Sequence, residues 1–479
     1  MRAQTMRSPA NPPRMTPAPG FRTVALIIAS AMFMEQLDGT ILATALPSMA
    51  ESFDVSPLHM SVALTSYMLS LAVFIPASGA IADRYGSRNV FRSAILLFTI
   101  GSILCGLSGN LPLLVLSRLL QGMGGAMMVP VGRLVLLRSV PKSELVSAMS
   151  WLLVPALIGP VIGPPLGGFI VTWASWRWIF YINVPIGIAG MWLATKYVPD
   201  VRIAERQRFD RVGFVLSGIS LSCLVFGLEM ASRGGTAGSG SAGLILGGLT
   251  VGAVYVWHSK RVANPILDLS LMRFTTFRLS VIAGSLTRIT AGSVPFLLPL
   301  MMQIGFGFSA AHSGVVTFVS ALGAMLMKAT AAPVLRKWGF RATLVWNGVL
   351  SMVCVALCAA FRPDWPLWTI YTVLLLSGFF QSLQFSAYNT VAYADVPSER
   401  FSSATSFYTT FQQLMLSLGI CVAAAALHVS VTWNGHEHAQ LPDFSVAFIV
   451  VTLVSLIAAP VCLLLPRNAG AEMSGHRER

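Results

Sequence analysis

The sequence predicts an all-α membrane protein made of two related six-helix bundles with two further helices inserted between them. Three observations support this fold class. The chain of 479 residues is 55% hydrophobic and only 10% charged, whereas soluble domains carry about 25% charged residues. About fourteen stretches are apolar over the roughly 20 residues that a membrane-spanning helix requires. The second half of the chain also repeats features of the first.

The repeat is clearest in a short basic segment between apolar stretches. Asp83–Arg88 (DRYGSR) recurs 253 positions later as Arg336–Arg341 (RKWGFR), and an offset of 256 maps Gly122 onto Gly378. Repeated halves within an apolar chain are typical of many secondary transporters, in which the substrate site lies between the halves.

The predicted spans form two groups of six with a pair between them. The first group occupies 21–198, the second 266–466, and the connecting segment 199–265 contains the pair. The spans are centred near Met34, Leu71, Leu97, Met123, Ile158, Gly187, Ser220, Gly248, Ala291, Gly323, Leu350, Leu376, Met415 and Leu453. The inserted pair has no counterpart in either half, so we expect it to be a spacer that fills the lipid-facing cleft between them.

Topology explains the net charge of +14 better than a nucleic-acid partner does. Of the 32 Lys and Arg residues, 25 fall in one alternating set of loops and tails and three in the opposite set. Basic loops stay on the cytoplasmic side of a membrane. We therefore expect both tails, 1–20 and 467–479, to be cytoplasmic. The first is rich in Pro and Arg and is expected to be disordered.

Motifs that mark several classes of enzyme are absent from the sequence. It contains no phosphate-binding loop, nucleophile elbow or zinc motif, and its six Cys and seven His residues lack metal-ligand spacing. We therefore expect no enzyme activity, no catalytic residue and no metal or other cofactor, with a proton gradient as the energy source. The expected partners are membrane lipid, a small-molecule substrate and protons, with no nucleic acid, and the chain is expected to be a monomer.

Two acidic residues, Glu35 and Asp38, lie deep in the first span, and we expect no other acid at such depth. They are three residues apart, so they share one face of a helix. Two neighbouring carboxylates in a poorly solvated site can exchange protons near neutral pH. Asp38 is the preferred candidate for proton coupling, and Glu35 is the second. The alternative is that both only pair with cations of other helices and hold the bundle together.

Polar residues in later spans are candidates for lining a substrate cavity. Arg118 and Gln121 lie near Gly122 on one surface of the fourth span, and the offset of 253 relates Arg288 to Glu35. A guanidinium group that faces lipid has no partner, so we expect both arginines to face the path between the halves. Weaker candidates, which hydrogen bonds between helices explain equally well, are Gln381, Gln384 and Gln412.

The end of the second span carries a candidate conformational latch, formed by Gly79, Asp83, Arg84, Gly86 and Arg88. Gly79 would allow close packing and Gly86 a tight turn. Asp83 can accept hydrogen bonds from a helix N-terminus or pair with a cation. Such a cluster would hold one conformation and release in the other. The second copy has an arginine in place of Asp83, so we expect the latch to be asymmetric.

The fifth span is dense in glycine and proline. These residues are Gly159, Pro160, Gly163, Pro164, Gly167 and Gly168. Proline bends a helix, and glycine lets another helix approach closely. We expect a bent helix that packs tightly against the eighth span or the other half and seals the path while the halves move.

These segments resemble signatures of the major facilitator superfamily. Gly79–Arg88 is similar to its loop between the second and third spans, Arg118–Gly122 to its fourth span, and Gly159–Gly168 to the fifth-span signature of exporters. Leu37–Pro47 resembles the first span of the fourteen-span drug:proton antiporters, the EmrB/QacA group, with Ala43 where that signature usually has Asn. Three stretches are more similar still to MdtD-type transporters: Ser56–Met60, Gly124–Leu134 and Gln303–Phe308.

The resemblance implies the major facilitator fold and a proton-coupled exporter of drugs or small metabolites in the bacterial inner membrane, working by alternating access. Deep basic residues (Arg118, Arg288 and Lys328) outnumber the two deep acids. This leaves open an exporter of organic anions, such as carboxylates or their metal complexes. An uptake symporter fits the fifth-span signature less well, and a sensor without transport fits the short tails less well.

Overall fold

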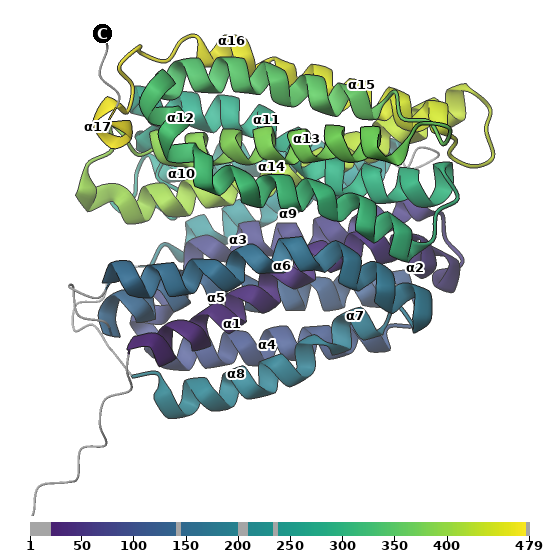
Figure 1. Ribbon diagram of the computed structural model, residues 1–479. Helices are drawn as coiled ribbons and strands as arrows, with labels where there is room; N and C mark the ends of the chain where they lie inside the picture. Colours follow the sequence, from purple (N-terminus) through teal and green to yellow (C-terminus); the bar gives the residue numbers. More distant parts are fainter. Residues whose placement is uncertain (1–20, 140–144, 200–208, 233–237, 476–479) are drawn as a thin grey trace, which may run out of the picture.

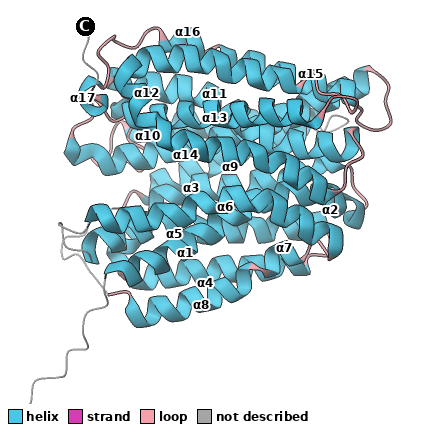
Figure 2. Cartoon of the chain, in the orientation of Figure 1, coloured by secondary structure: helices cyan, strands magenta, loops and turns pink. Residues whose placement is uncertain are grey.

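The computed structural model describes residues 21–139, 145–199, 209–232 and 238–475. In these ranges the chain forms long helices that run side by side and contains no strand (Figures 1 and 2). Helices are expected in a bilayer, because a helix satisfies its own backbone hydrogen bonds where no water is available. The predicted tail 1–20 lies outside the described residues.

The first six spans form a bundle that we call the N-half. Its helices are α1 (Phe21–Ile41) with η1 (Leu42–Ala45) and α2 (Leu46–Phe53), η2 (Pro57–Met60), α3 (Ser61–Tyr85), α4 (Ser87–Leu107), α5 (Leu111–Ser139), α6 (Leu145–Trp173), and α7 (Trp178–Tyr181) with α8 (Asn183–Tyr197). In Figure 1 this bundle is drawn in purple to blue and occupies the lower part of the molecule.

The inserted pair, α9 (Arg211–Ser232) and α10 (Gly238–Ser259), follows, and its two helices pack against each other. The remaining spans form the C-half, drawn in teal through green to yellow in Figure 1. Its helices are η4 (Leu269–Arg273), α11 (Thr275–Leu300) with η5 (Met301–Gly305), α12 (Ala310–Cys358), α13 (Leu367–Val391), η6 (Ser398–Arg400), α14 (Phe401–Trp433), and α15 (Leu441–Leu456) with α16 (Ala458–Cys462), followed by the short α17 (Ala471–Ser474).

The described helices amount to fourteen spans, as the sequence predicts. Twelve are long and apolar enough to cross a membrane. One of these, α12, has 49 residues and would be about 73 Å long if straight, more than twice the ~30 Å hydrocarbon core. It is two spans joined at Gly339, whose backbone is not helical (φ 69°, ψ 172°). The one span still to be counted is α6, a 29-residue helix in which Leu157–Trp173 is an apolar segment.

Corresponding turns in the two halves are built in the same way. Gly86, with φ 87°, joins α3 directly to α4, and Gly339, with φ 69°, joins the two arms of α12. Side chains with a Cβ atom rarely adopt a positive φ, so both positions favour glycine. The sequence offset of 253 therefore relates two turns that have the same structural role.

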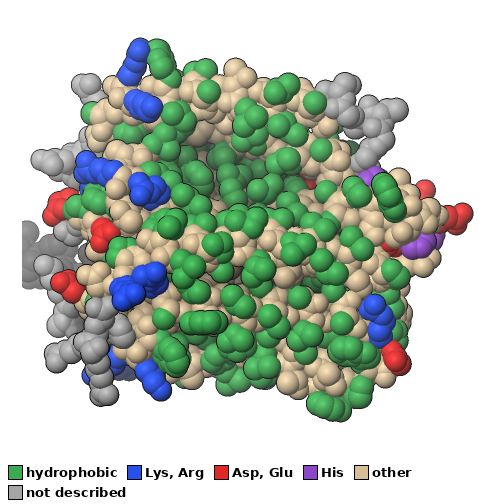
Figure 3. All heavy atoms as spheres, turned by 90° about the horizontal axis from the view of Figure 1, so that it is seen from above, with side chains coloured by type: hydrophobic (Ala, Val, Ile, Leu, Met, Phe, Trp, Pro, Cys, Tyr) green, Lys and Arg blue, Asp and Glu red, His purple; other side chains and the backbone are tan. Residues whose placement is uncertain are grey.

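Basic side chains gather at one end of the bundle, which we call the basic end. It lies on the left in Figure 3, the side on which α17 lies in Figure 1. Hydrophobic side chains cover most of the face between the two ends in Figure 3. An apolar band between a basic end and a less basic one is the surface expected of a protein embedded in a bilayer.

The two halves meet along a seam in which α6 packs against α12 and α3 packs against α14. Glycines allow backbones to touch there. A Cβ atom at Gly168 would lie 2.3 Å from the carbonyl oxygen of Ala310, and one at Gly314 would lie 2.3 Å from that of Pro164. Of the two predicted partners of the fifth span, the other half is confirmed, because α6 packs tightly on α12, which begins with the tenth span, and not on α10, the eighth.

Hydrogen bonds also join the halves at the end away from the basic one, which we call the opposite end. The backbone N–H of Ala311 donates to Thr172 Oγ1 at 2.9 Å, and Gln303 Nε2 donates to the carbonyl oxygen of Thr44 at 3.1 Å. Together with the glycine contacts, these bonds close the seam at the opposite end.

Arg133 is an exposed basic side chain that lies near both halves at the basic end. It lies in the part of α5 nearest that end, and its side chain is exposed. It is within electrostatic reach of Glu35 in the N-half and of Tyr393, which follows α13 in the C-half. The Arg133 side chain is therefore exposed at the basic end although groups of both halves lie near it.

The glycine contacts of the seam predict a stability difference. Gly168→Ala would force apart two backbones, and overpacking of this kind costs about 1–3 kcal/mol. We expect a lower midpoint of thermal unfolding in detergent. Gly247→Ala in α10 is the matched control, because a Cβ atom there meets nothing within 4 Å. Equal unfolding midpoints for the two variants would contradict the described seam.

Candidate functional site

Asp38 lies at the centre of a buried network inside the N-half, and its side chain is 1% exposed. Arg118 Nη1 donates to Asp38 Oδ2 at 2.6 Å, which makes a buried ion pair between α1 and α5. Gln121 Nε2 donates to Asp38 Oδ1 at 2.7 Å, and Asn183 Nδ2 from α8 donates to the same oxygen at 3.1 Å. The carboxylate is therefore held by one cation and two amides.

Arg118 extends this network to α3. Its Nε donates to the carbonyl oxygen of Ala63 at 3.1 Å, and its Cζ lies 4.3 Å from the centre of the Tyr67 ring. Its side chain is 0% exposed. Arg118 does not face lipid, as predicted, but in this conformation it points into the N-half, where Asp38 balances its charge. Removing one partner of such a buried pair costs about 3–5 kcal/mol.

Gln121 orients the carboxylate and the guanidinium at the same time. Its Oε1 accepts a hydrogen bond from Arg118 Nη1 at 2.6 Å, while its Nε2 also donates to Ser102 Oγ of α4 at 2.7 Å. The backbones of α4 and α5 approach closely here, because a Cβ atom at Gly101 would lie 2.6 Å from the Cα of Gln121. Sequence reasoning missed Ser102 and Asn183, since a single neutral polar residue in an apolar span carries no positional signal.

Glu35 lies about one helical turn from Asp38 in a different environment. It is 8% exposed and makes no hydrogen bond with the described residues. A Cβ atom at Gly125 would lie 3.6 Å from its Cγ and 2.8 Å from the hydroxyl of Tyr67, so Glu35 borders α3 and α5. The first span thus presents one fully paired carboxylate and one that has only more distant charges, Asp38 and Arg133, within reach.

Arg288 has partners of another kind, although the offset relates it to Glu35. Its Nη2 donates to Asn389 Oδ1 at 2.9 Å, to the hydroxyl of Tyr408 at 3.0 Å and to Gln412 Oε1 at 3.4 Å. Its Cζ lies 5.3 Å from the centre of the Phe385 ring. The side chain is only 4% exposed, and no described acid forms an ion pair with it. Arg288 is therefore a buried cation held by neutral groups.

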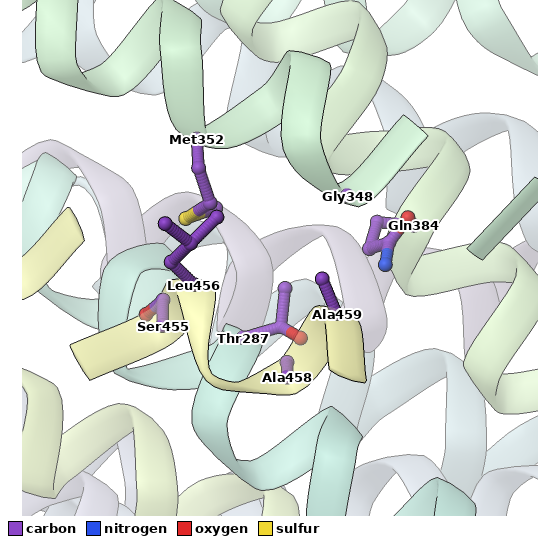
Figure 4. Close-up of a pocket in the computed structure, with 8 residues that line it drawn as sticks. All are labelled: Thr287, Gly348, Met352, Gln384, Ser455, Leu456, Ala458 and Ala459. Atoms are coloured by element: carbon purple, nitrogen blue, oxygen red, sulfur yellow. The ribbon is translucent and has the colours of Figure 1, made fainter. Parts of the chain in front are cut away.

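The other predicted cavity residues lie apart from Arg118. Gln412 belongs to the Arg288 cluster, whereas Gln381 Nε2 donates to Ser377 Oγ within α13 at 3.2 Å. Gln384 is buried between α12 and α13, where it accepts from Asn347 Nδ2 at 2.8 Å. It also lines a cavity of about 10 Å³, roughly the size that holds one water molecule, together with Thr287 from α11 and Ser455 from α15 (Figure 4).

The predicted latch forms the turn at Gly86. Arg88 Nη2 donates to the carbonyl oxygen of Thr195, which ties the turn to α8, and Arg84 lies 5.5 Å from the centre of the Tyr85 ring. Asp83 is half-buried and has an interaction partner. Gly79 differs from the expectation: a Cβ atom there would meet nothing within 4 Å, so no helix packs closely on it in this conformation.

The glycines of α6 allow close packing against α1 as well as against α12. A Cβ atom at Gly159 would lie 3.0 Å from the Cβ of Gln36, one at Gly163 would lie 2.1 Å from Thr40 Oγ1, and one at Gly167 would lie 2.5 Å from the carbonyl oxygen of Ile41. Gly168 and Pro164 contact α12 at the seam, while Pro160 lies between Gly159 and Gly163. Helix α1, which carries Asp38, therefore packs closely against α6, which forms part of the seam.

Glu229 in α9 is a further buried acid and is 1% exposed. Sequence reasoning did not single it out. Glu229 is in the last turn of α9, close to a polar loop, so hydropathy alone assigns it to the membrane surface. Its burial depends on helices α3 and α14, which pack against α9.

Comparison with known proteins agrees with this arrangement. The model of the Major Facilitator Superfamily matches residues 28–420 and 281–476. Proteins named "Putative multidrug resistance protein MdtD" from Salmonella typhimurium (strain LT2) and Salmonella typhi are 39% identical over 442 residues, which covers 91% of this chain and 94% of theirs. The resemblance to MdtD-type transporters noted in the sequence is thus confirmed.

Solved structures share the fold at low sequence identity. The D-xylose-proton symporter has a TM-score of 0.67 at 14% identity and covers 94% of this chain and 98% of its own. The nucleoside transporter NupG has a TM-score of 0.65 at 16% identity and covers 93% and 98%. A bacterial homolog of the human lysosomal transporter Spinster, inward-facing and unoccupied, has a TM-score of 0.66 at 13% identity and covers 93% and 97%. The family match and the 39% identical relatives establish that the chain, whose fold these structures share, belongs to the major facilitator superfamily.

Proposed function

We propose that the protein is a proton-coupled antiporter that exports drugs or small metabolites across the inner membrane by alternating access. The single observation that carries this proposal is the buried Asp38–Arg118 ion pair, at 2.6 Å, with Glu35 nearby on the same helix. The name of the relatives supports a multidrug substrate range. We also propose the monomer as the working unit.

The basic end is proposed to face the cytoplasm, since basic loops remain on that side. The seam is closed at the opposite end, while Arg133 is exposed near both halves at the basic end. We therefore propose that the structure corresponds to an inward-facing state. In this state substrate would enter from the cytoplasm. Export then requires the seam to open at the opposite end and close at the basic end.

Protonation of Asp38 would switch the network. A protonated carboxyl group no longer balances the charge of Arg118 and accepts fewer hydrogen bonds from Gln121 and Asn183. The cost of breaking a buried pair, about 3–5 kcal/mol, is comparable with the ~5.5 kcal/mol that moves a two-state equilibrium from 1:99 to 99:1. Proton binding at Asp38 can therefore bias the whole bundle between its states.

Contacts between α1 and α6 provide a route from Asp38 to the seam. Thr40, close to Asp38 on α1, fits against Gly163 of α6, and α6 contacts α12 through Gly168. A movement of α1 that follows protonation would thus shift the helix that closes the path. We propose Glu35 as the group that passes protons between Asp38 and the accessible space beside Arg133. The Asp83 turn would hold the basic end in one state and release it in the other.

One observation favours a second candidate, an exporter of organic anions. Arg288 is a buried cation whose described partners are neutral, and its Nε has no hydrogen-bond partner among them. A carboxylate on the substrate would supply the missing charge and accept a charge-assisted hydrogen bond. The names of the relatives favour the drug exporter, so anion export remains the second candidate.

The proton-coupling role of Asp38 can be tested in inverted membrane vesicles with an imposed pH gradient. Asp38→Asn removes the charge and keeps the size, and we expect it to abolish accumulation of drugs against their gradient while downhill movement persists. Asp54→Asn, the same change at an exposed acid, is the matched control and should transport normally. If Asp38→Asn keeps full uphill transport and Glu35→Gln loses it, then Glu35 and not Asp38 is the proton-coupling residue.

The charge class of the substrate can be tested through Arg288. Arg288→Met keeps the length of the side chain and removes its charge. If anions are bound there, their affinity falls about tenfold or more, as expected for a lost hydrogen bond to a charged group, while cations are unaffected or bind better. Arg278→Met, in an exposed position of the same helix, controls for the change in net charge. Equal effects on cations and anions would argue against an anion site.

A further inference from the structure

Glu229 of the inserted helix α9 contacts both halves of the protein. Its carboxylate accepts a hydrogen bond from Ser61 Oγ at 2.6 Å, and Thr65 Oγ1 lies 3.5 Å from its other oxygen. Cys421 Sγ donates to that oxygen at 3.5 Å. Ser61 and Thr65 belong to α3 of the N-half, whereas Cys421 belongs to α14 of the C-half.

These contacts lie where the seam is closed. Ser61 is the first residue of α3, and Glu229 is in the last turn of α9. Here α3 and α14 pack against each other, and α9 packs against both. All four side chains are buried, with exposures of 1% for Glu229 and 3% or less for Ser61, Thr65 and Cys421. The carboxylate is thus enclosed by three helices from three parts of the chain.

A carboxylate in this position depends on the hydrogen bonds that surround it, because a buried charge without partners is strongly unfavourable. If the halves separate at this end, α9 can stay with α3 or with α14 but not with both. Some of the hydrogen bonds to Glu229 are then lost. The closed seam is the arrangement in which both oxygens keep their described partners.

We propose that Glu229 is a positioning residue of the transport cycle, which holds the seam closed at the opposite end and makes α9 a component of the gate. The insert is then more than the spacer that the sequence suggests. The proposal rests on the alternating-access function proposed above. It concerns the balance between the two states and assigns Glu229 no contact with substrate.

Hydrogen–deuterium exchange of the purified full-length protein in lipid nanodiscs tests this proposal without substrate or gradient. In Glu229→Leu we expect exchange to rise about tenfold at the opposite end, in 61–66 and 417–425, since a hydrogen bond to a charged group is lost. In the same sample, exchange should fall at the basic end, in 22–30 and 401–408. Glu229→Gln, which can still accept from Ser61, should show a smaller shift of the same sign.

The reciprocal pattern separates gating from simple loss of structure. Ser220→Ala is the matched control, because Ser220 Oγ donates only within the inserted pair, to the carbonyl oxygen of Gly248 at 2.8 Å. It should leave both ends unchanged. Faster exchange at both ends in the Glu229 variants would reveal a merely structural role and overturn the proposal, as would no change at either end. If Glu229→Leu does not fold, the direction of the exchange changes at the two ends of Glu229→Gln decides between a gating and a structural role.

This experiment also distinguishes the gate from the proposed function. Faster exchange at the opposite end with slower exchange at the basic end supports the role of Glu229 in the gate, even if no drug is exported in vesicles. In that case only the proposed export function is overturned. Normal drug export without a reciprocal shift leaves the exporter in place and overturns the role of Glu229.

Discussion

The buried ion pair between Asp38 and Arg118 is the interaction on which the rest of the N-half depends. Through Asp38, Arg118 and their direct partners it joins α1, α3, α4, α5 and α8. Buried pairs gain little net stability, because desolvation offsets the attraction, but they are costly to break from one side. A network of this kind is therefore suited to two states, one with the carboxylate charged and paired and one with it neutral and released.

The seam connects the charge state of Asp38 with the conformation of the whole molecule. Glycines of α6 pack against α1 on one face and against α12 on another. Helix α1, which carries Asp38, and helix α12 of the other half therefore both contact α6. Packed backbones of this kind do not deform gradually, since an added methyl group already clashes. On our proposal, α9 adds a second closure between α3 and α14 through Glu229. Both closures lie at the same end, which explains how one end can be sealed while Arg133 stays exposed at the other.

Much of the fold follows from the sequence because its determinants are local. Span length, apolar composition and the two related glycine turns at Gly86 and Gly339 are visible without knowing any contact. Charge at membrane depth likewise marked Asp38, Arg118 and Arg288 as candidates. The partners of these charges could not be predicted, since Ser102 and Asn183 are single neutral residues far apart in the chain. Glu229 was missed for a related reason: its burial is set by neighbouring helices and not by its own segment. Gly79 shows the reverse error, because a glycine suited to close packing has no neighbour in this conformation.

The most direct test of this account is to count protons when substrate binds to the purified protein in a weakly buffered solution. Binding of an exported drug to the unmodified protein is expected to release protons. Asp38→Asn is expected to bind the drug and to release none, or at least one fewer per molecule. Proton release by Asp38→Asn equal to that of the unmodified protein would contradict the assignment of Asp38 as the group that couples protons to transport.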